Sequence, residues 1–378
     1  MISSIEPPQR VARLAPLSDV HAALQRLAGR VSPVACDVRA AANRVLGVDL
    51  VAPVASPAVP LALRDGWAVA SDSVTDASSY APVPLRRPHW VDSGEPMPAD
   101  TDAVLPLDCV TATSGRQEAI APVAFGDGVL AAAADARQRQ VLRRAGERLR
   151  ISDVAVTQLL GCEQAHVCVP RIAVIAPKAA LSADGDAIAP FLMAAIDAQG
   201  GVAHRVVVDA VEGAFAHALT GCEADDAVIT IGGTGSGRSD RAVHALAEVG
   251  HVAMHGMAIA PGETAALGAI ANRPVLMLPG RLDATLAVWL LVGRPLLEHL
   301  TGALPVIAHR KCVLTRKIAS TLGMTEVVLV RLTPDGAQPL ASRHFPLSAI
   351  THADGWVVVP PQSEGFPPGA LIAVHSLP

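Results

Sequence analysis

The alternation of strand-like and helix-like segments between residues 171 and 303 constrains the fold more than any other feature of the sequence. Runs such as RIAVIAP, VAHRVVV and DAVITI have the length and composition of buried strands, and DAIAPFLMAAIDAQGG and SDRAVHALAEVG have the apolar spacing of helices. A long apolar helix, DATLAVWLLVGRPLLEHLTG, is expected to close the region. Strands and helices that alternate in this way form a mostly parallel sheet covered on both faces. We therefore predict a central α/β domain over residues 171–303.

One strand of this domain leads directly into a Gly-rich loop, residues 232–240, in the stretch ITIGGTGSGRSDRA. Open α/β sheets bind ligands where their strands end, and glycine lets backbone N–H groups approach an anion closely. A helix expected to begin near Ser239 would direct its positive end to the same place. The loop is neither a Walker loop nor GxGxxG, so we predict a site for phosphate or a related oxyanion rather than a generic dinucleotide site. A glycine-rich turn without a ligand is the competing interpretation.

The regions on either side of the α/β domain are predicted to be mainly β-structure. Residues 1–170 contain short apolar runs between Pro, Gly and Asp clusters, with little helix apart from a segment over 17–29 that Ser18 could cap. We expect two subdomains in this N-terminal part. The tail, residues 304–378, holds only strand-like runs and is predicted to form a small β-barrel or sandwich, of which we favour the barrel.

Composition narrows the classes of function. The chain of 378 residues is 51% hydrophobic and 17% charged, with a net charge of −5 and no basic block, which argues against a nucleic-acid partner. The longest apolar stretch, from Ala284, is too short to span a bilayer, the N-terminus has no apolar signal region, and the six cysteines fit no zinc pattern. We expect a cytoplasmic protein with reduced thiols and no membrane partner. His251 and His255 fall in a strand-like run, so their spacing does not predict a metal-binding pair.

Several motifs, in their order along the chain, resemble those of the MoeA family, the molybdopterin molybdenumtransferases, which include the E domain of gephyrin. The Gly-rich loop is similar to the GGTG-x4-D loop of the molybdopterin-binding domain. Each of the other motifs is weak alone, but their common order is specific. They are RDGWAVASD (64–72), VDSGEPMPADTDAVLPLD (91–108), VLRRAGERL (141–149), AIAPGETAALG (258–268) and LPGRLDAT (278–285).

The resemblance implies an elongated, four-part chain that forms a homodimer, with the active site between the α/β domain of one subunit and the N-terminal region of the other. It implies insertion of molybdate into adenylylated molybdopterin with release of AMP, in the presence of Mg²⁺ or another divalent metal. A molybdopterin adenylyltransferase or a molybdoenzyme would be a further partner.

The resemblance also implies roles for individual residues. Asp65, Asp209 and Asp240 would be catalytic and would hold the metal. Arg281 is not a family residue, but we expect it to be catalytic as well, because a guanidinium can stabilise an oxyanion. For the three aspartates, plain turn, capping and helix-dipole roles remain open. The pterin would be bound by Gly232, Gly233, Ser236, Arg238, Pro261, Gly262, Pro279, Gly280 and Ser93.

Other motif positions depart from the family. An acidic family position is Lys178, two lysine positions are Gly256 and Ala260, and a third is Glu263. Arg148 replaces a family aspartate, Arg281-Leu282 replaces an Asn-Pro pair, RHFPLSA replaces a Gly-Ser motif, and the segment through Asp184-Gly185-Asp186 is altered. Because molybdate and pyrophosphate are anions, lost lysines matter. The sequence leaves three possibilities: an enzyme whose site uses arginine instead, a catalytically degenerate pterin-binding or cofactor-delivery protein, and a scaffold that keeps only the fold.

Overall fold

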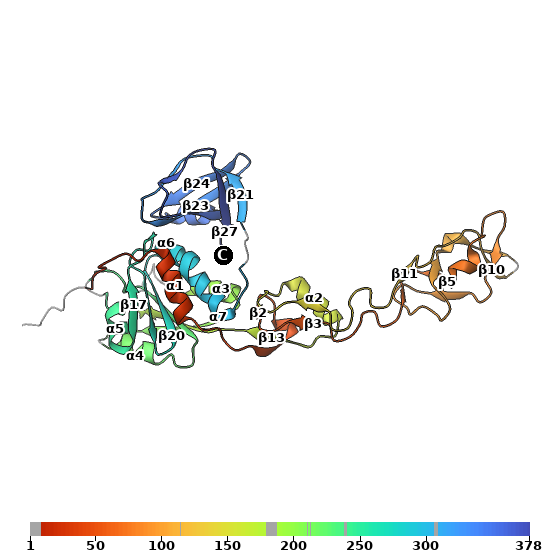
Figure 1. Cartoon of the computed structure of the whole chain (residues 1–378), viewed down its shortest axis with the longest axis horizontal. Coiled ribbons are helices and arrows are strands. Elements are labelled where there is room, and N and C mark those ends of the chain that lie inside the picture. Colours follow the sequence, from red (N-terminus) through yellow and green to blue (C-terminus); the bar gives the residue numbers. More distant parts are fainter. Residues whose placement is uncertain are drawn as a thin grey trace, which may run out of the picture.

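The computed structural model describes residues 9–113, 115–178, 187–209, 211, 213–237, 240–305 and 309–378. The molecule is elongated (Figure 1). An α/β domain and a C-terminal β-sheet form one end, and an N-terminal arm, residues 31–169, extends from it to the other end. This multidomain α/β plus β architecture confirms the predicted fold class, while the exact domain boundaries stay predictions.

The α/β domain is built on a six-stranded sheet with the order β15-β14-β16-β20-β19-β17. The first four strands are parallel to one another, whereas β19 runs antiparallel to both of its neighbours, β20 and β17. The sheet is therefore mostly parallel, as predicted. In sequence order these strands are β14 (Arg171–Pro177), β15 (Val202–Val208), β16 (Ala227–Ile231), β17 (His251–His255), β19 (Ala266–Ile270) and β20 (Arg273–Leu278).

Helices bury both faces of this sheet. Along β14, Ile172 and Val174 join one apolar core while Ala173 and Ile175 join the other, as expected for a strand covered on two sides. The first core also contains residues of α1 (Leu17–Leu27), α3 (Ile188–Ala198), α6 (Leu282–Val288) and α7 (Arg294–Thr301). The second contains residues of α4 (Ala214–Thr220) and α5 (Ala242–Val249). Helix α1, assigned from the sequence to the N-terminal region, therefore packs on the α/β domain.

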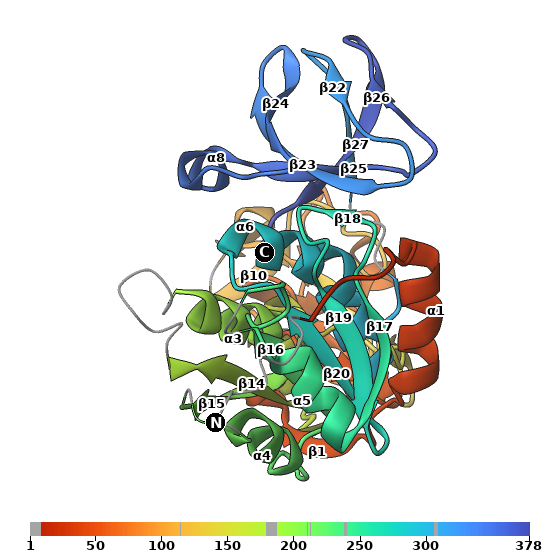
Figure 2. The same cartoon turned by 90° about the vertical axis from the view of Figure 1, so that its left-hand side faces the viewer.

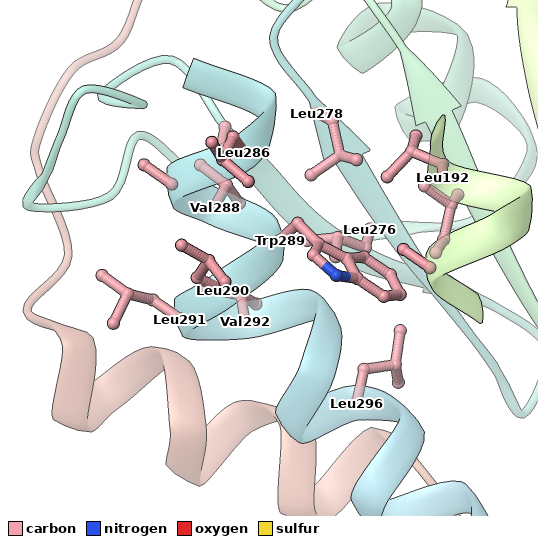
Figure 3. Packing of buried hydrophobic residues seen from close by; sticks show 14 of the residues in the cluster. Leu192, Leu276, Leu278, Leu286, Val288, Trp289, Leu290, Leu291, Val292 and Leu296 are labelled. Carbon is pink, nitrogen blue, oxygen red and sulfur yellow. The ribbon is translucent and has the colours of Figure 1, made fainter. Parts of the chain in front are cut away.

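The predicted long closing helix is divided into α6 and α7 by a π-helical turn, Trp289–Gly293. Trp289 is fully buried and lies close to Leu276 and Leu192 (Figure 3). A Cβ on Gly293 would lie 2.3 Å from the indole ring, so the last residue of the π-helical turn must be small. The helix thus accommodates one large aromatic side chain by a local change of hydrogen bonding.

The N-terminal arm consists of small sheets. Nearest the α/β domain, β13 (Gln164–Cys168) lies between β1 (Val34–Asp37) and β2 (Val45–Leu46), beside helix α2 (Ile151–Leu159). At the far end, β5 (Gly66–Val69) lies between β7 (His89–Val91) and β8 (Ala103–Leu105). The remaining arm strands are β3 (Leu50–Val51), β4 (Leu61–Ala62), β6 (Val83–Pro84), β9 (Val110–Thr113), β10 (Arg116–Ala119), β11 (Val129–Leu130) and β12 (Val141–Arg143).

The C-terminal sheet has the order β18-β23-β25-β27-β21, with β24 also paired to β23. Its strands are β18 (Ile259–Ala260), β21 (His309–Val313), β23 (Thr325–Thr333), β24 (Gly336–Ser342), β25 (Gly355–Val359) and β27 (Leu371–Ser376), beside a small pair of β22 (Ile318–Ala319) and β26 (Gly365–Phe366). The expected barrel is not closed by a continuous ladder, because the chain after β21 meets β24 only at one bridge, Leu314 to Ala337. A short helix, α8 (Leu347–His352), corrects the expectation that this tail holds only strands.

The C-terminal sheet lies over α6 and the ends of the central strands (Figure 2). Strand β18 belongs in sequence to the α/β domain but pairs with β23, and Phe345 and Trp356 of the C-terminal sheet share the first core. The two parts therefore form a junction held by both backbone pairing and apolar packing. None of the helices in the described ranges is long and apolar enough to cross a membrane.

Candidate functional site

Loops from five segments meet where the parallel strands of the α/β domain end, which we call the carboxyl edge. Lys178 follows β14, Asp209 follows β15, the Gly-rich loop follows β16, and Pro279 follows β20. Because β17 ends and β19 begins at this same edge, the segment 256–265 joins them. The carboxyl edge of an open α/β sheet is where this architecture binds ligands.

The first two glycines of the Gly-rich loop are required by its backbone. Gly232 and Gly233 have φ values of 76° and 70°, a left-handed conformation that glycine adopts without a steric penalty. A Cβ on Gly233 would lie 2.9 Å from the Cβ of Ala242, and one on Gly280 would lie 3.4 Å from the Cα of Gly232. The loop after β16 and the turn after β20 are therefore in direct backbone contact.

Asp240 is folded into the Gly-rich loop. Its Oδ2 accepts a hydrogen bond of 2.8 Å from the Gly237 amide and would lie 2.7 Å from a Cβ on Gly235. Ser236 is exposed on the same loop. Arg238 and Ser239 lie outside the described residues, and α5 begins at Ala242 rather than near Ser239. Asp240 therefore stabilises the turn, and its catalytic role stays a prediction.

Side chains that sequence reasoning missed brace the same loop. Gln9 is almost fully buried, and its Nε2 donates hydrogen bonds to the carbonyl oxygens of Gly233 (2.7 Å) and Gly235 (2.8 Å). His255 Nε2 lies 2.9 Å from the carbonyl oxygen of Thr234, so this histidine also contacts the Gly-rich loop. No local sequence pattern predicts these contacts, because Gln9 and Gly233 are 224 positions apart in the sequence.

The N-terminal segment also explains one lost lysine. Gly256 has a φ of 99°, and a Cβ there would lie 2.3 Å from the Cγ1 of Val11 and 2.8 Å from the carbonyl oxygen of Arg13. Ala15 pairs with Met257 beside this position. The space that a lysine side chain would need at Gly256 is therefore filled by the chain's own N-terminal segment.

The next motif surrounds Pro261 and Gly262, both of which are buried. A Cβ on Gly262, at φ 137°, would lie 2.4 Å from the Cγ2 of Val288, so this position needs glycine. The Glu263 side chain accepts a hydrogen bond of 3.1 Å from the Gly262 amide. Thr264 Oγ1 lies 3.1 Å from Thr234 Oγ1, which links this turn to the Gly-rich loop.

Asp209 forms an ion pair with Lys178, whose Nζ lies 3.0 Å from Asp209 Oδ1. Both side chains are well exposed, at 63% and 69%, so the pair is screened by solvent. Lys178 stands where the family has an acid, and it neutralises the neighbouring carboxylate. This corner of the edge therefore carries less negative charge than the family's motif would give it.

Arg281 follows the Pro279-Gly280 turn and is held by a buried carboxylate. Its Nε and Nη2 donate to Asp283 at 3.1 and 2.7 Å, and Asp283 also accepts from the amides of Ala284 and Phe345. His344 Nδ1, from the C-terminal sheet, lies 2.8 Å from Asp283 Oδ2. Burial raises the pKa of the Asp283 carboxyl, but these hydrogen bonds outweigh burial and hold its pKa below the ordinary value.

The adjacent residue, Arg343, is held by a second buried carboxylate. Its Nε lies 3.3 Å from Oε1 of Glu326, a fully buried residue of β23. Glu326 pairs in register with Ala260, the second lost lysine position. The junction between the α/β domain and the C-terminal sheet thus presents three basic side chains, Arg281, Arg343 and His344, which are 67%, 59% and 65% exposed.

Asp65 and Ser93 lie together, but at the far end of the N-terminal arm (Figure 1). Asp65 Oδ1 accepts a hydrogen bond of 2.7 Å from the Ser93 amide, and Asp65 is exposed. Within one chain, these two predicted site residues are therefore remote from the carboxyl edge. The edge gathers the other predicted residues that are described.

Arg148 belongs to neither location. Its guanidinium donates to the carbonyl oxygen of Asn43 (2.6 Å) and to the side chain of Gln199 (3.2 Å), where α3 ends. Arg44 donates similarly to the carbonyl oxygen of Gly201 (2.7 Å). These arginines connect the arm to the α/β domain, at the opposite edge of the sheet from the Gly-rich loop.

A divalent metal does not fit the described part of a single chain. It holds no group of three His, Cys, Asp or Glu side chains able to bind a metal ion. Asp209 is paired with Lys178, Asp240 is bonded within its own loop, and Asp65 is remote. The predicted metal role of these aspartates therefore depends on a second copy of the chain.

Comparison with known families decides the relationship. Three family models match successive parts of the chain: the MoeA N-terminal region (domains I and II) at residues 16–161, a probable molybdopterin binding domain at 172–299, and the MoeA C-terminal region (domain IV) at 311–377. The chain belongs to the MoeA family. The resemblance expected from the motifs is thus confirmed over nearly the whole length.

Individual relatives agree with this membership. Molybdopterin molybdenumtransferase 2 of Mycobacterium tuberculosis is 24% identical over 91% of this chain and 95% of its own length. A protein of Methanocaldococcus jannaschii named for molybdopterin biosynthesis is 24% identical over 90% of this chain and 91% of its own. The crystal structure of the molybdopterin biosynthesis MoeA protein of Pyrococcus horikoshii has the same fold, with a TM-score of 0.79 at 20% identity over 97% of this chain and 100% of that one.

At the positions matched to MoeA motifs by resemblance, the glycine turns are present and several charged residues differ. The left-handed glycines and the two Pro-Gly turns remain in contact, while the lost lysine positions are filled by the N-terminal segment or face a buried glutamate. Positive charge is supplied instead by Arg281, at the junction with the C-terminal sheet.

Proposed function

We propose that this protein is a molybdopterin molybdenumtransferase, which inserts molybdate into adenylylated molybdopterin and releases AMP. The single observation that carries this proposal is the meeting of two glycine turns with the basic residue Arg281 at one edge of the sheet. Relatives from Mycobacterium tuberculosis and Haemophilus influenzae bear the name of this activity. Molybdate and molybdopterin are substrates here, and both carry negative charge.

In the proposed reaction the backbone binds and the arginine stabilises charge. Gly232, Gly233 and Ser236, with the two Pro-Gly turns, would hold the pterin and its phosphate by close backbone approach. Arg281 would donate its planar fork to the oxyanion, which is the geometry that guanidinium offers to phosphate-like groups. Asp240 would keep the loop in shape, and Arg238 of the same loop would add positive charge for the oxyanion.

We further propose that the site is completed in a homodimer. Asp65 and Ser93 can act at the carboxyl edge only if a second copy brings them there, and a two-fold axis would supply both sites at once. Mg²⁺ would then be held by Asp65 of one copy together with Asp209 or Asp240 of the other.

The direct test is AMP release from adenylylated molybdopterin and molybdate, with Mg²⁺ or another divalent metal present. Release above a protein-free blank supports the proposal. A parent protein that binds the pterin but releases no AMP with any metal would replace it by the second candidate, a cofactor-delivery protein. That candidate is favoured by the engagement of Asp209 with Lys178 and of Asp240 with its own loop.

The shared site is tested by mixing two inactive variants, Asp65→Asn and Arg281→Ala. In a mixed dimer one site carries both changes and the other carries neither, so random exchange should restore about a quarter of the parent activity. Light scattering on the parent gives the oligomeric state independently. A monomer, or a mixture that stays inactive after subunits have exchanged, contradicts the shared site.

A further inference from the structure

The contacts of His344 at Asp283 cannot all be favourable at once. Its Nδ1 lies 2.6 Å from Arg281 Nη2 and 2.8 Å from Asp283 Oδ2. One ring nitrogen either accepts a hydrogen bond or donates one. If Nδ1 accepts from Arg281, two acceptors face each other at Asp283, and if it donates to Asp283, two donors face each other at Arg281.

This conflict defines two arrangements of the cluster. In the first, Arg281 stays on Asp283 and the His344 proton is on Nε2. In the second, His344 carries its proton on Nδ1 and donates to Asp283 Oδ2, while Arg281 has moved away. Conversion exchanges one ring proton with water, which an exposed side chain allows. The first arrangement removes the donor–donor contact with Arg281 but keeps two acceptors at Asp283, whereas the second removes both unfavourable contacts.

The second arrangement keeps the buried carboxylate partnered. The Asp283 side chain is 4% exposed, and a buried charge that loses its ionic partner is strongly destabilising. If Arg281 left without a replacement, only the amides of Ala284 and Phe345 would remain as donors to Asp283. A proton on His344 Nδ1 supplies the missing donor, so the release of Arg281 costs less free energy.

We propose that Asp283 is a point of exchange at which an oxyanion draws Arg281 away and His344 takes its place. The ligand class is a tetrahedral oxyanion, either molybdate or a phosphate group, and its identity as substrate rests on the function proposed above. His344 and Asp283 are positioning residues in this scheme, since they act through Arg281. Neither is a catalytic residue.

The neighbouring pair, Arg343 and Glu326, provides an internal control. Glu326 is fully buried and accepts from the Thr321 amide and from Arg343, but no histidine lies against it among its described contacts. Arg343 therefore has no replacement donor and should remain on Glu326 when an anion binds. The two arginines are similarly exposed, at 67% and 59%, so exposure alone does not distinguish them.

Calorimetric titration of the full chain with sodium molybdate, and separately with sodium phosphate, tests the exchange. His344→Ala should weaken binding of the preferred anion by at least about fivefold, because a donor to a charged group is lost. His344→Asn retains a donor close to the position of Nδ1 and should recover most of the affinity. Arg343→Lys should change the affinity by less than about twofold, and thermal unfolding checks that each variant folds.

Nitrogen NMR of His344 supplies a readout that a merely structural role would not move. The anion should shift the ring proton from Nε2 to Nδ1 in the parent, and Arg281→Ala should show the Nδ1 form without anion. An affinity of His344→Ala equal to that of the parent, an unchanged tautomer at saturation, or no binding of either anion would overturn the exchange. Failure of AMP release with the exchange intact would overturn only the proposed function.

Discussion

Two parts of the carboxyl edge, which we call its floor and its rim, differ in how closely their residues match the MoeA motifs. The floor, made by the Gly-rich loop and the two Pro-Gly turns, keeps the residues of the MoeA motifs because its backbone conformations exclude side chains. The rim has Gly256 and Ala260 where the resemblance places family lysines, and Arg281 presents a basic side chain at the junction with the C-terminal sheet. Steric requirements fix a residue type at one position, whereas a charge can be supplied from another element.

The largest expected effect separates the rim from the floor. Arg281→Ala should slow AMP release by an amount corresponding to about 2–4 kcal/mol, the range for removal of one preorganised donor, while pterin binding is largely retained. Rapid-quench measurement of AMP gives the rate, and fluorescence titration gives the pterin affinity. Equal losses in rate and in pterin affinity would remove the distinction between rim and floor.

The floor is tested by Gly233→Val. At a φ of 70°, with Ala242 Cβ at 2.9 Å from the added Cβ, this change should lower pterin affinity at least about tenfold, roughly 1.4 kcal/mol. Gly161→Val is the matched control, since Gly161 has a φ of 74° with nothing within 4 Å and follows helix α2 in the N-terminal arm. It should show the backbone strain in thermal unfolding but leave pterin affinity unchanged. Equal affinity losses in both variants would assign the effect to stability alone.

A cluster of Asp153, Arg143 and Arg150 in the arm is expected to stabilise the fold without acting on the ligand. Asp153 accepts from Arg143 and Arg150; burial opposes its ionisation, but these hydrogen bonds lower the pKa of its carboxyl from 3.8 to about 2. Because the folded-state pKa is depressed, this stability is present above pH 4 and is lost as the pH falls towards 2. Asp153→Asn should lower the free energy of unfolding at pH 7 by about 1–2 kcal/mol and remove that part of the acid dependence. Urea unfolding of the parent and the variant, at pH 7 and at a pH near 2, measures this free energy. If the variant loses as much stability as the parent between the two pH values, the assignment is contradicted.

The smallest effect is expected at the exposed pair of Lys178 and Asp209. Lys178→Ala should change the free energy of unfolding by less than about 0.5 kcal/mol, since an exposed pair is worth little. The change should, however, slow AMP release if Lys178 neutralises Asp209 near the anions. Lys178→Arg keeps the charge and should leave the rate unchanged. A loss of stability above 1 kcal/mol in Lys178→Ala would show that the pair is more than a surface contact.

The sequence predicted the floor better than the rim, and the reason is locality. A strand followed by glycines has a local pattern, so Gly232 and Gly233 could be assigned to a turn at the carboxyl edge. Gln9 and His344 have no such pattern, because they meet the site through contacts between residues 224 and 61 positions apart. The role of Arg281 as an oxyanion ligand stays a prediction.

Element predictions divide in a similar way. The six central strands follow from apolar runs bounded by turns, whereas the wide turn at Trp289 and the six-residue helix α8 depend on tertiary packing. The N-terminal helix was predicted as an element, but its packing on the α/β domain was not, since amphipathic spacing shows that a helix has an apolar face and not what covers it.

A single-turnover experiment tests the central claim, that the changed rim still supports transfer above a retained floor. The parent protein is first saturated with adenylylated molybdopterin, molybdate is then added with Mg²⁺, and AMP is quantified over time beside Arg281→Ala at equal pterin occupancy. We predict that the parent releases close to one AMP per bound pterin and that the variant does so much more slowly. Bound pterin that stays adenylylated in the parent would contradict the claim and leave a protein that only binds the cofactor precursor.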